Sequence, residues 1–354
     1  MKGLSYTIAL LVGLGLGFFP SMERPRPMWW KAIVIVLTSF VIIAALMPPL
    51  GGTFFEAALA SQLEQNRPKL PVKAHVLKDT KHFDEVAQGW RVEMRDLGST
   101  PMTEKVLFKT KTFPTELETA DIAVINVEFD RASKTFTAQN IVATDPLLTI
   151  PFIPALSERT RNLYFHVPMA WVAVLAYLIS MIYGILYLKK GDLVYDIKSS
   201  SAAALGTLFT ILATLTGAIW AKFNWGSFWN WDPRQTSIFI LMLIYGAYFA
   251  LRSSIEGDER RARLSSVYSI LAFVTVPFLI FILPRITEGL HPGAKGDENA
   301  GPLVSSSPDA INPLLSMIFS ASLAAFTLIY FWLLGIQIRL KKVALRSSLA
   351  AHDE

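Results

Sequence analysis

The sequence predicts an all-α polytopic membrane protein with six or seven transmembrane helices and an inserted small, mainly-β extracytoplasmic domain. Two observations predict this architecture. First, 52% of the 354 residues are hydrophobic, and they are concentrated in long runs. Second, one segment of about 100 residues interrupts these runs with a more polar sequence in which apolar and polar residues alternate.

Six apolar runs are close to the length of about 20 residues that a bilayer-spanning helix needs. They are 30–49, 165–188, 201–221, 235–251, 266–284 and 313–338. An earlier run, Leu4–Phe19, is shorter and contains Gly13, Gly15 and Gly17. We expect it to be a retained short helix packed through small residues, because Pro20 and basic residues follow it where a signal peptide would have a cleavage site.

The distribution of lysine and arginine predicts the orientation. Basic clusters lie at 24–31, 189–198, 252–263 and 339–346, and all four fall on one side if the six spans alternate. The positive-inside rule makes that side the cytoplasm. These loops also account for the net charge of +5 without a nucleic-acid partner. The opposite side then carries residues 50–164, 222–234 and 285–312 of a multi-pass membrane protein.

The segment 51–160 differs from the rest of the chain. Strand-like alternation occurs at 89–94, 121–129 and 135–141, which predicts a largely β domain inserted between two helices. The expected organisation is an N-terminal membrane segment at 1–50, the insert at 51–160, a membrane core at 161–340 and a cytoplasmic tail at 341–354. The sequence does not indicate what the insert binds.

The chain contains no cysteine, which excludes thiolate ligands, disulfides and covalent haem attachment through two cysteines. Metal ligation therefore depends largely on five histidines: His75, His82, His166, His291 and His352. His166 and His291 lie at the outer ends of two predicted spans. An imidazole in such an apolar and aromatic setting is a good axial ligand for haem iron, although a single interfacial histidine is more often an ordinary polar cap.

The segment between the third and fourth predicted spans contains three of the nine tryptophans within seven residues, at Trp225, Trp229 and Trp231. Interfacial anchoring accounts for one or two of them. Three, interleaved with Gly226 and Phe228, form an aromatic platform large enough for a flat hydrophobic ligand. Haem is the candidate, because both outer histidines are expected on the same face of the membrane.

The polar residues beside this motif each have a structural and a functional interpretation. Asp232, followed by Pro233, is typical of a helix N-cap with proline in the first turn, and we expect it also to hold an indole or an arginine. Lys222, Arg234 and Arg285 are candidate partners for the haem propionates, or simply interfacial anchors.

Three motifs together resemble the family of cytochrome c maturation protein C, also called haem exporter protein C. The pattern Trp225-Gly226-x-x-Trp229-x-Trp231-Asp232 is similar to its tryptophan-rich signature. The stretches around His166 (Tyr-Phe-His-Val-Pro) and His291 (Leu-His-Pro-Gly) resemble its two histidine sites. The resemblance covers roughly residues 160–340, and the insert at 51–160 departs from the usual family pattern.

The resemblance implies that His166 and His291 ligate the iron of a non-covalent, transiently bound haem b, and that Trp225–Asp232 cradles the porphyrin. It also implies transfer of haem to a periplasmic haem chaperone, release of the loaded chaperone by an ATP-binding-cassette complex, and contacts with other cytochrome c maturation proteins. The sequence identifies no bond-breaking chemistry, so a haem-handling factor describes the protein better than an enzyme does.

Three alternatives remain open at this point. A membrane subunit of a cytochrome c synthase shares the tryptophan-rich signature and would present haem directly to apocytochrome c. A b-type cytochrome would require histidine pairs inside the helices. A transporter would place charged or broken helices at mid-membrane.

Overall fold

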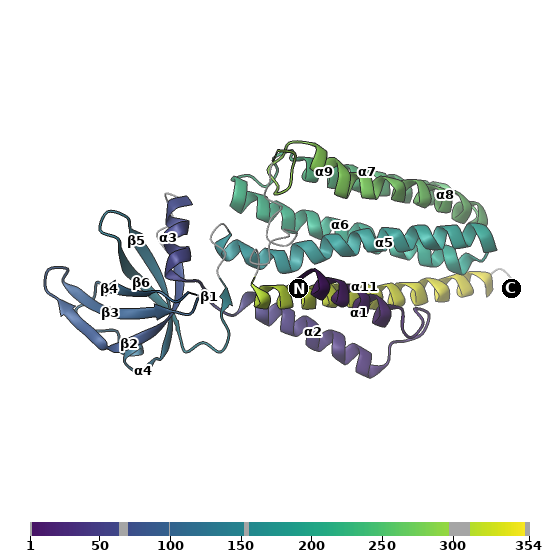
Figure 1. The fold of residues 1–354 in the computed structure, drawn as a ribbon. Coiled ribbons are helices and arrows are strands. Elements are labelled where there is room, and N and C mark those ends of the chain that lie inside the picture. The colour runs from purple at the N-terminus through teal and green to yellow at the C-terminus, as the bar shows by residue number, and fades with distance from the viewer. Residues whose placement is uncertain (1, 64–69, 99, 152–155, 297–311, 351–354) are drawn as a thin grey trace. The chain divides into compact units, whose positions relative to one another are not determined.

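The computed structural model describes residues 2–63, 70–98, 100–151, 156–296 and 312–350 (Figure 1). The chain divides into two compact units. The first combines Met1–Val41 with Asn162–Glu354 and is helical, and the second, Ile42–Arg161, is mainly β.

The main helices are α1 (Lys2–Phe18), α2 (Met28–Leu46), α5 (Leu163–Lys190), α6 (Leu193–Trp225), α7 (Pro233–Ser254), α8 (Asp258–Pro277), α9 (Leu283–Ile286) and α11 (Pro313–Ala350). Among the described residues, six helical segments are long and apolar enough to cross a membrane. They correspond to the six predicted runs and confirm a multi-pass membrane protein. His352 and the last residues of the predicted tail lie outside the described residues.

Several helices extend beyond the apolar runs that predicted them, and α6 shows why. It begins at Leu193, where the Asp192 carboxylate accepts a hydrogen bond from the Val194 amide at 2.8 Å. Its first turns contain buried polar residues, including Asp196 and Ser199. These side chains find partners on neighbouring helices, so hydropathy alone underestimates the length of α6.

Helix α1 is present, as the sequence predicted, and packs against α11. A Cβ atom added at Gly13 would lie 3.2 Å from Thr327, and one at Gly17 would lie 2.1 Å from the Phe331 ring. Gly15 faces open space instead. The close approach of α1 to α11 therefore depends on Gly13 and Gly17, which are four residues apart and share one helix face.

Two large apolar clusters form the centre of the helical unit, and a smaller one packs Trp30 and Val34 of α2 against Leu328 of α11. One large cluster joins α5, α6 and α11 and includes Val172, Phe209 and Phe331. The other joins α5, α6, α7 and α8, and in it the rings of Tyr177 and Tyr245 stack with centroids 3.5 Å apart. Helices α5 and α6 belong to both large clusters and form the centre of the bundle, which positions the residues at their ends.

The second unit is a closed five-stranded barrel. Its strands are β2 (Leu70–Asp84), β3 (Gly89–Asp96), β4 (Thr103–Phe108), β5 (Ile122–Asp130) and β6 (Thr135–Thr144). They pair in the order β2-β3-β4-β6-β5, with β4 and β6 parallel and the other pairs antiparallel. This is a Greek-key barrel of the OB type. The three predicted strands correspond to β3, β5 and β6.

The barrel unit also contains helices α3 (Phe54–Leu63) and α4 (Thr115–Thr119), which the alternation pattern did not reveal. Helix α3 begins with a capping box in which the Thr53 and Glu56 side chains exchange hydrogen bonds with each other's backbone N–H groups. The short strands β1 (Leu50–Gly51) and β7 (Ile150–Pro151) pair in parallel, so the chain segments that enter and leave the barrel run side by side.

Candidate functional site

The tryptophan motif begins on a helix. Helix α6 continues through Trp225 and ends at Gly226, whose φ of 82° is left-handed and favours glycine. The Gly226 amide donates to the Lys222 carbonyl at 3.1 Å, and the Lys222 ammonium donates to the Gly226 carbonyl at 2.9 Å. Lys222 therefore caps the end of α6, a role that the sequence did not assign to it.

The loop that follows, residues 226–232, is here called the tryptophan loop. Two hydrogen bonds of the Gln235 side chain hold it in place. The Gln235 side chain accepts a hydrogen bond from the Asn230 amide at 2.8 Å and donates one to the Phe228 carbonyl at 3.2 Å. Gln235 is buried in the first turn of α7. The sequence interpretation missed this role, although an amide side chain just inside a helix start is well suited to bind a preceding loop.

The aromatic rings of the motif contact one another and rings of neighbouring elements, including Phe239 of α7. Trp225 lies edge-on to the His291 ring, with centroids 4.6 Å apart, and Trp229 lies edge-on to Trp231 at 5.7 Å. Trp231 is 70% exposed and has a φ of 54°, which is uncommon for a bulky residue. The loop thus holds an exposed indole in a strained backbone conformation, a feature that is frequent at binding sites.

Asp232 connects the tryptophan loop to the second histidine. One carboxylate oxygen accepts from the Arg234 amide at 2.9 Å, so Asp232 is the N-cap of α7, as expected. The same oxygen lies 2.7 Å from His291 Nδ1, and the other accepts from the Leu290 amide at 2.7 Å. The sequence suggested an indole or an arginine as the second side-chain partner, whereas the structure places an imidazole there.

The Asp232 carboxylate is ionised at neutral pH. Burial by itself would raise its pKa, but the hydrogen bond and charge of His291 and the two backbone N–H donors outweigh burial and lower the pKa of Asp232 to about 2. An ionised carboxylate has no proton to donate, so His291 Nδ1 must carry the hydrogen. The ring is thereby oriented with Nε2 directed away from Asp232.

His166 lies in the first turns of α5 and is held against α6. Its Nδ1 atom lies 3.0 Å from the Ala213 carbonyl oxygen and 3.1 Å from the Thr216 hydroxyl. A carbonyl oxygen only accepts hydrogen bonds, so Nδ1 is the protonated nitrogen here as well. A Cβ atom added at Gly217 would lie 2.8 Å from the ring, so Gly217 provides the space that His166 occupies.

The start of α5 contains a proline, Pro168, which removes one hydrogen bond of the helix. Pro168 lacks an N–H group, which leaves the Tyr164 carbonyl without its usual intrahelical donor. The Ser322 hydroxyl of α11 donates to this carbonyl instead. This contact ties the turn that carries His166 to α11.

The segment before His291 is also irregular. Helix α8 continues into a single π turn, η2 (Phe278–Ile282), and then into α9. π turns inside helices are frequent at functional sites because they re-aim the residues that follow. The loop after α9 is closed by a hydrogen bond from the Lys295 amide to the Thr287 carbonyl at 3.0 Å, and His291 lies within that loop.

The two histidines therefore use the same helix as a common support. His166 contacts α6 at positions 213–217, and His291 contacts Trp225, the last residue of α6. Gly217 and Trp225 are eight residues apart, which corresponds to a rise of about 12 Å. Within the described residues neither Nε2 atom has a hydrogen-bond partner, so both nitrogens can ligate a metal.

The other two predicted propionate partners, Arg234 and Arg285, differ in their surroundings. Arg234 donates from Nη2 to the Pro292 carbonyl at 3.3 Å, beside His291, and its Nε is buried without a hydrogen-bond partner in the described part of the chain. Such a guanidinium is suited to an added anionic partner. Arg285 is exposed on α9, and among the described residues no hydrogen bond or ion pair joins it to the tryptophan loop.

These features define a class: a multi-pass membrane protein with two orientation-fixed imidazoles, both packed against the helix that ends in a tryptophan-rich loop. The family model of heme exporter protein C matches residues 139–348, more than half of the chain. The chain therefore belongs to the heme exporter protein C family.

Individual relatives match shorter segments. Heme exporter protein C of Paracoccus denitrificans is 33% identical over 134 residues, which are 38% of this chain and 56% of that protein. The protein of the same name from Rhodobacter capsulatus is 30% identical over 164 residues, 44% of this chain and 68% of that protein. Cytochrome c biogenesis protein CcsA of Fagopyrum esculentum is 33% identical over 93 residues, 26% and 28% of the two chains.

Proposed function

We propose that this protein binds haem b non-covalently at the outer face of the membrane, with His166 and His291 as the axial ligands of the iron. The observation that carries this proposal is the common hydrogen-bond arrangement of the two rings. Each Nδ1 donates to an acceptor that has no proton of its own, the Ala213 carbonyl or the Asp232 carboxylate. Each Nε2 is then the basic nitrogen available to iron.

The tryptophan loop would contact the porphyrin. Trp225, which touches His291, and the Trp229–Trp231 pair supply apolar ring surface, while Gly226 and Asp232 fix the two ends of the loop. The unpaired Nε of Arg234 suits a propionate beside His291, and Arg285 is the second candidate.

The bound haem would then be delivered for c-type cytochrome maturation. The names of the relatives support this role, and the exposure of Trp231 and Phe228 suits a ligand that must leave again. We expect the acceptor to be a periplasmic haem chaperone, with an ATP-binding-cassette complex releasing the loaded chaperone and other maturation proteins nearby. The expected location is the bacterial inner membrane, with the haem site and the barrel unit on the periplasmic side.

A second candidate is a membrane subunit of a cytochrome c synthase that presents haem directly to apocytochrome c. The similarity to cytochrome c biogenesis protein CcsA favours it, but that match covers only 26% of this chain. The two functions differ in whether a separate haem chaperone is required.

Complementation tests the proposal and separates the two candidates. In a bacterial host that lacks its own heme exporter protein C, we expect the wild type to restore haem-stained c-type cytochromes. His166→Ala and His291→Ala should fail, while His82→Ala, which changes an exposed histidine of strand β2, should behave as wild type. Restoration in a host that also lacks the haem chaperone would favour the synthase function, and full activity of both site variants would refute the paired-histidine site.

A further inference from the structure

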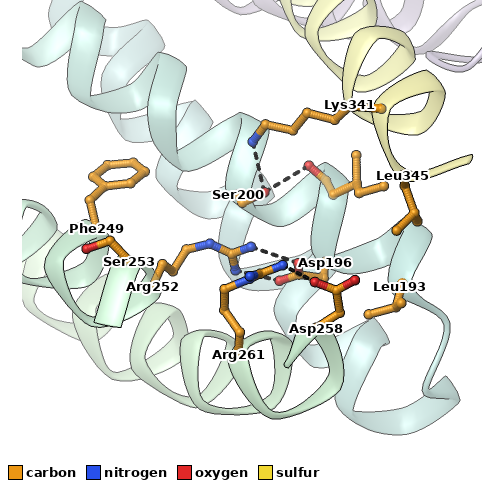
Figure 2. A pocket seen from close by; sticks show the side chains of 12 residues that line it. Leu193, Asp196, Ser200, Phe249, Arg252, Ser253, Asp258, Arg261, Lys341 and Leu345 are labelled. Carbon is orange, nitrogen blue, oxygen red and sulfur yellow. Dashed lines mark hydrogen bonds and ion pairs between the residues drawn. The ribbon is translucent and has the colours of Figure 1, made fainter. Parts of the chain in front are cut away.

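A second site lies at the other end of α6 from the tryptophan loop. A pocket of about 580 Å³ opens there between the ends of α6, α7, α8 and α11 (Figure 2). Apolar residues including Leu193, Phe249 and Leu345 form part of its wall, and charged residues and two serines line the rest. This end of the bundle also carries the basic clusters that the sequence places on the cytoplasmic side.

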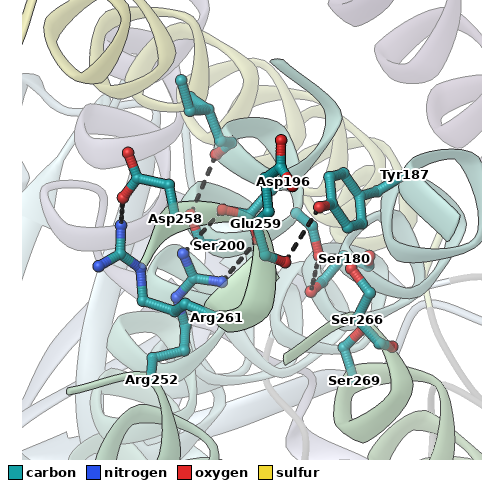
Figure 3. A network of polar contacts seen from close by, with 12 residues as sticks. Ser180, Tyr187, Asp196, Ser200, Arg252, Asp258, Glu259, Arg261, Ser266 and Ser269 are labelled. Carbon is teal, nitrogen blue, oxygen red and sulfur yellow. Dashed lines mark hydrogen bonds and ion pairs between the residues drawn. The ribbon is translucent and has the colours of Figure 1, made fainter. Parts of the chain in front are cut away.

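Two arginines of the pocket already have carboxylate partners. Arg252 of α7 forms two parallel hydrogen bonds with Asp196 of α6, at 2.6 and 2.8 Å, and this pair is largely buried. Arg261 pairs with Asp258 three residues earlier on α8. Figure 3 shows both pairs, which leave no net charge between them.

Lys341 is a further cation of the pocket, and neither Asp196 nor Asp258 forms an ion pair with it. Its ammonium group reaches from α11 into the pocket and donates to the Ser200 hydroxyl at 3.1 Å. Ser200 is buried and uncharged, and among the described residues Lys341 takes part in no ion pair. A partly buried ammonium group without a counter-ion is unfavourable, so the pocket has the charge balance of a site for one negative charge.

We propose that this pocket binds the phosphate of an acidic phospholipid headgroup. A phosphodiester carries a single negative charge, which matches Lys341, and its oxygens can accept hydrogen bonds from Lys341 and Arg261. The apolar wall would contact the glycerol and the first carbons of the acyl chains. Basic pockets between transmembrane helices on the cytoplasmic side are suited to such headgroups.

This site is independent of the proposed haem function, since it lies at the opposite end of α6 from Trp225 and uses none of the same side chains. A soluble phosphate shares the same chemistry, so the experiment must separate the two sources. Lys341→Gln removes the charge and keeps a polar side chain. Arg346→Gln removes an exposed cation from the same helix, outside the pocket, and is the matched control.

The test is a titration of the full-length protein in detergent, followed by thermal unfolding and by native mass spectrometry of retained adducts. The probes are phosphatidylglycerol, phosphatidylcholine and inorganic phosphate. We expect phosphatidylglycerol to raise the unfolding temperature of the wild type and of Arg346→Gln, with an affinity at least about tenfold weaker in Lys341→Gln. Arg261→Gln should weaken binding to a smaller extent.

Two results would overturn the proposal. Equal stabilisation of Lys341→Gln and wild type by phosphatidylglycerol would exclude the pocket as the binding site. Stabilisation by inorganic phosphate that is lost in Lys341→Gln, with no further effect of phosphatidylglycerol, would assign the pocket to a soluble phosphate. Haem spectra of Lys341→Gln should match those of the wild type in every case, which keeps this test separate from the test of the haem site.

Discussion

At the scale of single residues, Asp232 connects three parts of the candidate site. Its carboxylate caps α7, holds the backbone at Leu290 and orients the His291 ring. Carboxylates that accept from a ligating histidine increase the basicity of that ligand. His166 has a neutral carbonyl in the corresponding place, so we expect His291 to be the stronger of the two proposed iron ligands.

Replacement of Asp232 by asparagine tests the contribution of its negative charge. Asparagine is as good an N-cap as aspartate, but it has one acceptor oxygen where the carboxylate has two, so the hydrogen bond to Leu290 or to His291 is lost and we expect Asp232→Asn to lower the stability by about 1–3 kcal/mol. It removes the negative charge beside His291, and we expect haem affinity to fall by about 10- to 100-fold. Haem titration of the purified variant measures the affinity, and an affinity equal to that of the wild type would show that the charge has no part in binding.

The packing of His166 provides a second prediction. In Gly217→Ala the new Cβ atom would lie 2.8 Å from the ring and displace it from its present orientation. We expect haem affinity to fall by about tenfold or more, with the fold retained. Gly246→Ala on α7 is the control, since no atom lies within 4 Å of its Cβ position. If both variants bind haem equally well, the position of His166 is not critical.

At the scale of elements, the contact between α1 and α11 can be tested in the same way. A Cβ atom at Gly17 would lie 2.1 Å from the buried Phe331 ring, which has little room to move. Gly17→Ala should therefore destabilise the protein by about 1–3 kcal/mol. Gly15→Ala, which faces open space, should be neutral or slightly stabilising. Thermal unfolding in one detergent compares them, and equal stabilities would mean that α1 is not packed as described.

Glu23 joins the α1–α2 connection to two helices. It forms ion pairs with Lys198 of α6 and Lys342 of α11, and these hydrogen bonds and charges lower the pKa of Glu23 from 4.5 to about 2. The pKa is lower in the folded state than in the unfolded state. The stabilisation is therefore complete above about pH 4.5 and is lost as the pH falls through about 2.

The corresponding experiment compares the wild type with Glu23→Gln between pH 7 and pH 2. We expect the variant to unfold at a lower temperature at pH 7, and the difference to shrink as the pH falls below about 4.5. A difference that is independent of pH would mean that the two ion pairs do not contribute. Glu23 is partly exposed, so the effect should decrease at high salt.

Some of the helices and strands could be predicted from the sequence, and others could not. The six long helices were predictable because lipid-facing segments must be apolar over their whole length. The first turns of α6 could not be predicted in this way, because they contain the polar residues Asp196 and Ser199. These residues form hydrogen bonds with Arg252 and Ser180, which belong to other helices. In the barrel, β3, β5 and β6 alternate clearly, whereas the long strand β2 has a register shift between Leu77 and His82 that interrupts its pattern.

The candidate site was predictable in its residues and less so in its contacts. His166, His291 and the tryptophans stand out by residue type and by their position at span ends. The bond between Asp232 and His291 joins residues 59 positions apart, and no local pattern indicates it. The roles of Gln235 and Gly217 were also not predictable. Each depends on a contact made in the folded chain, that of Gln235 with the tryptophan loop and that of Gly217 with the His166 ring.

At the scale of the whole molecule, the barrel unit should be separable from haem binding. Its entering and leaving segments run side by side at β1 and β7, so a short flexible linker can replace residues 53–149. If the proposed haem chaperone docks on the barrel unit, we expect this variant to retain the haem spectrum and to lose much of its haem transfer to that chaperone. Unchanged transfer, measured with purified components, would show that the barrel unit is not the docking site.

The most direct test of the central claim is the optical spectrum of the purified full-length protein, oxidised and reduced, with haem quantified as the pyridine haemochrome. We expect a six-coordinate b-type spectrum in the wild type, which is lost or shifted in both His166→Ala and His291→Ala. Protein purified from haem-replete cells without haem, or a spectrum that neither substitution changes, would contradict the paired-histidine site.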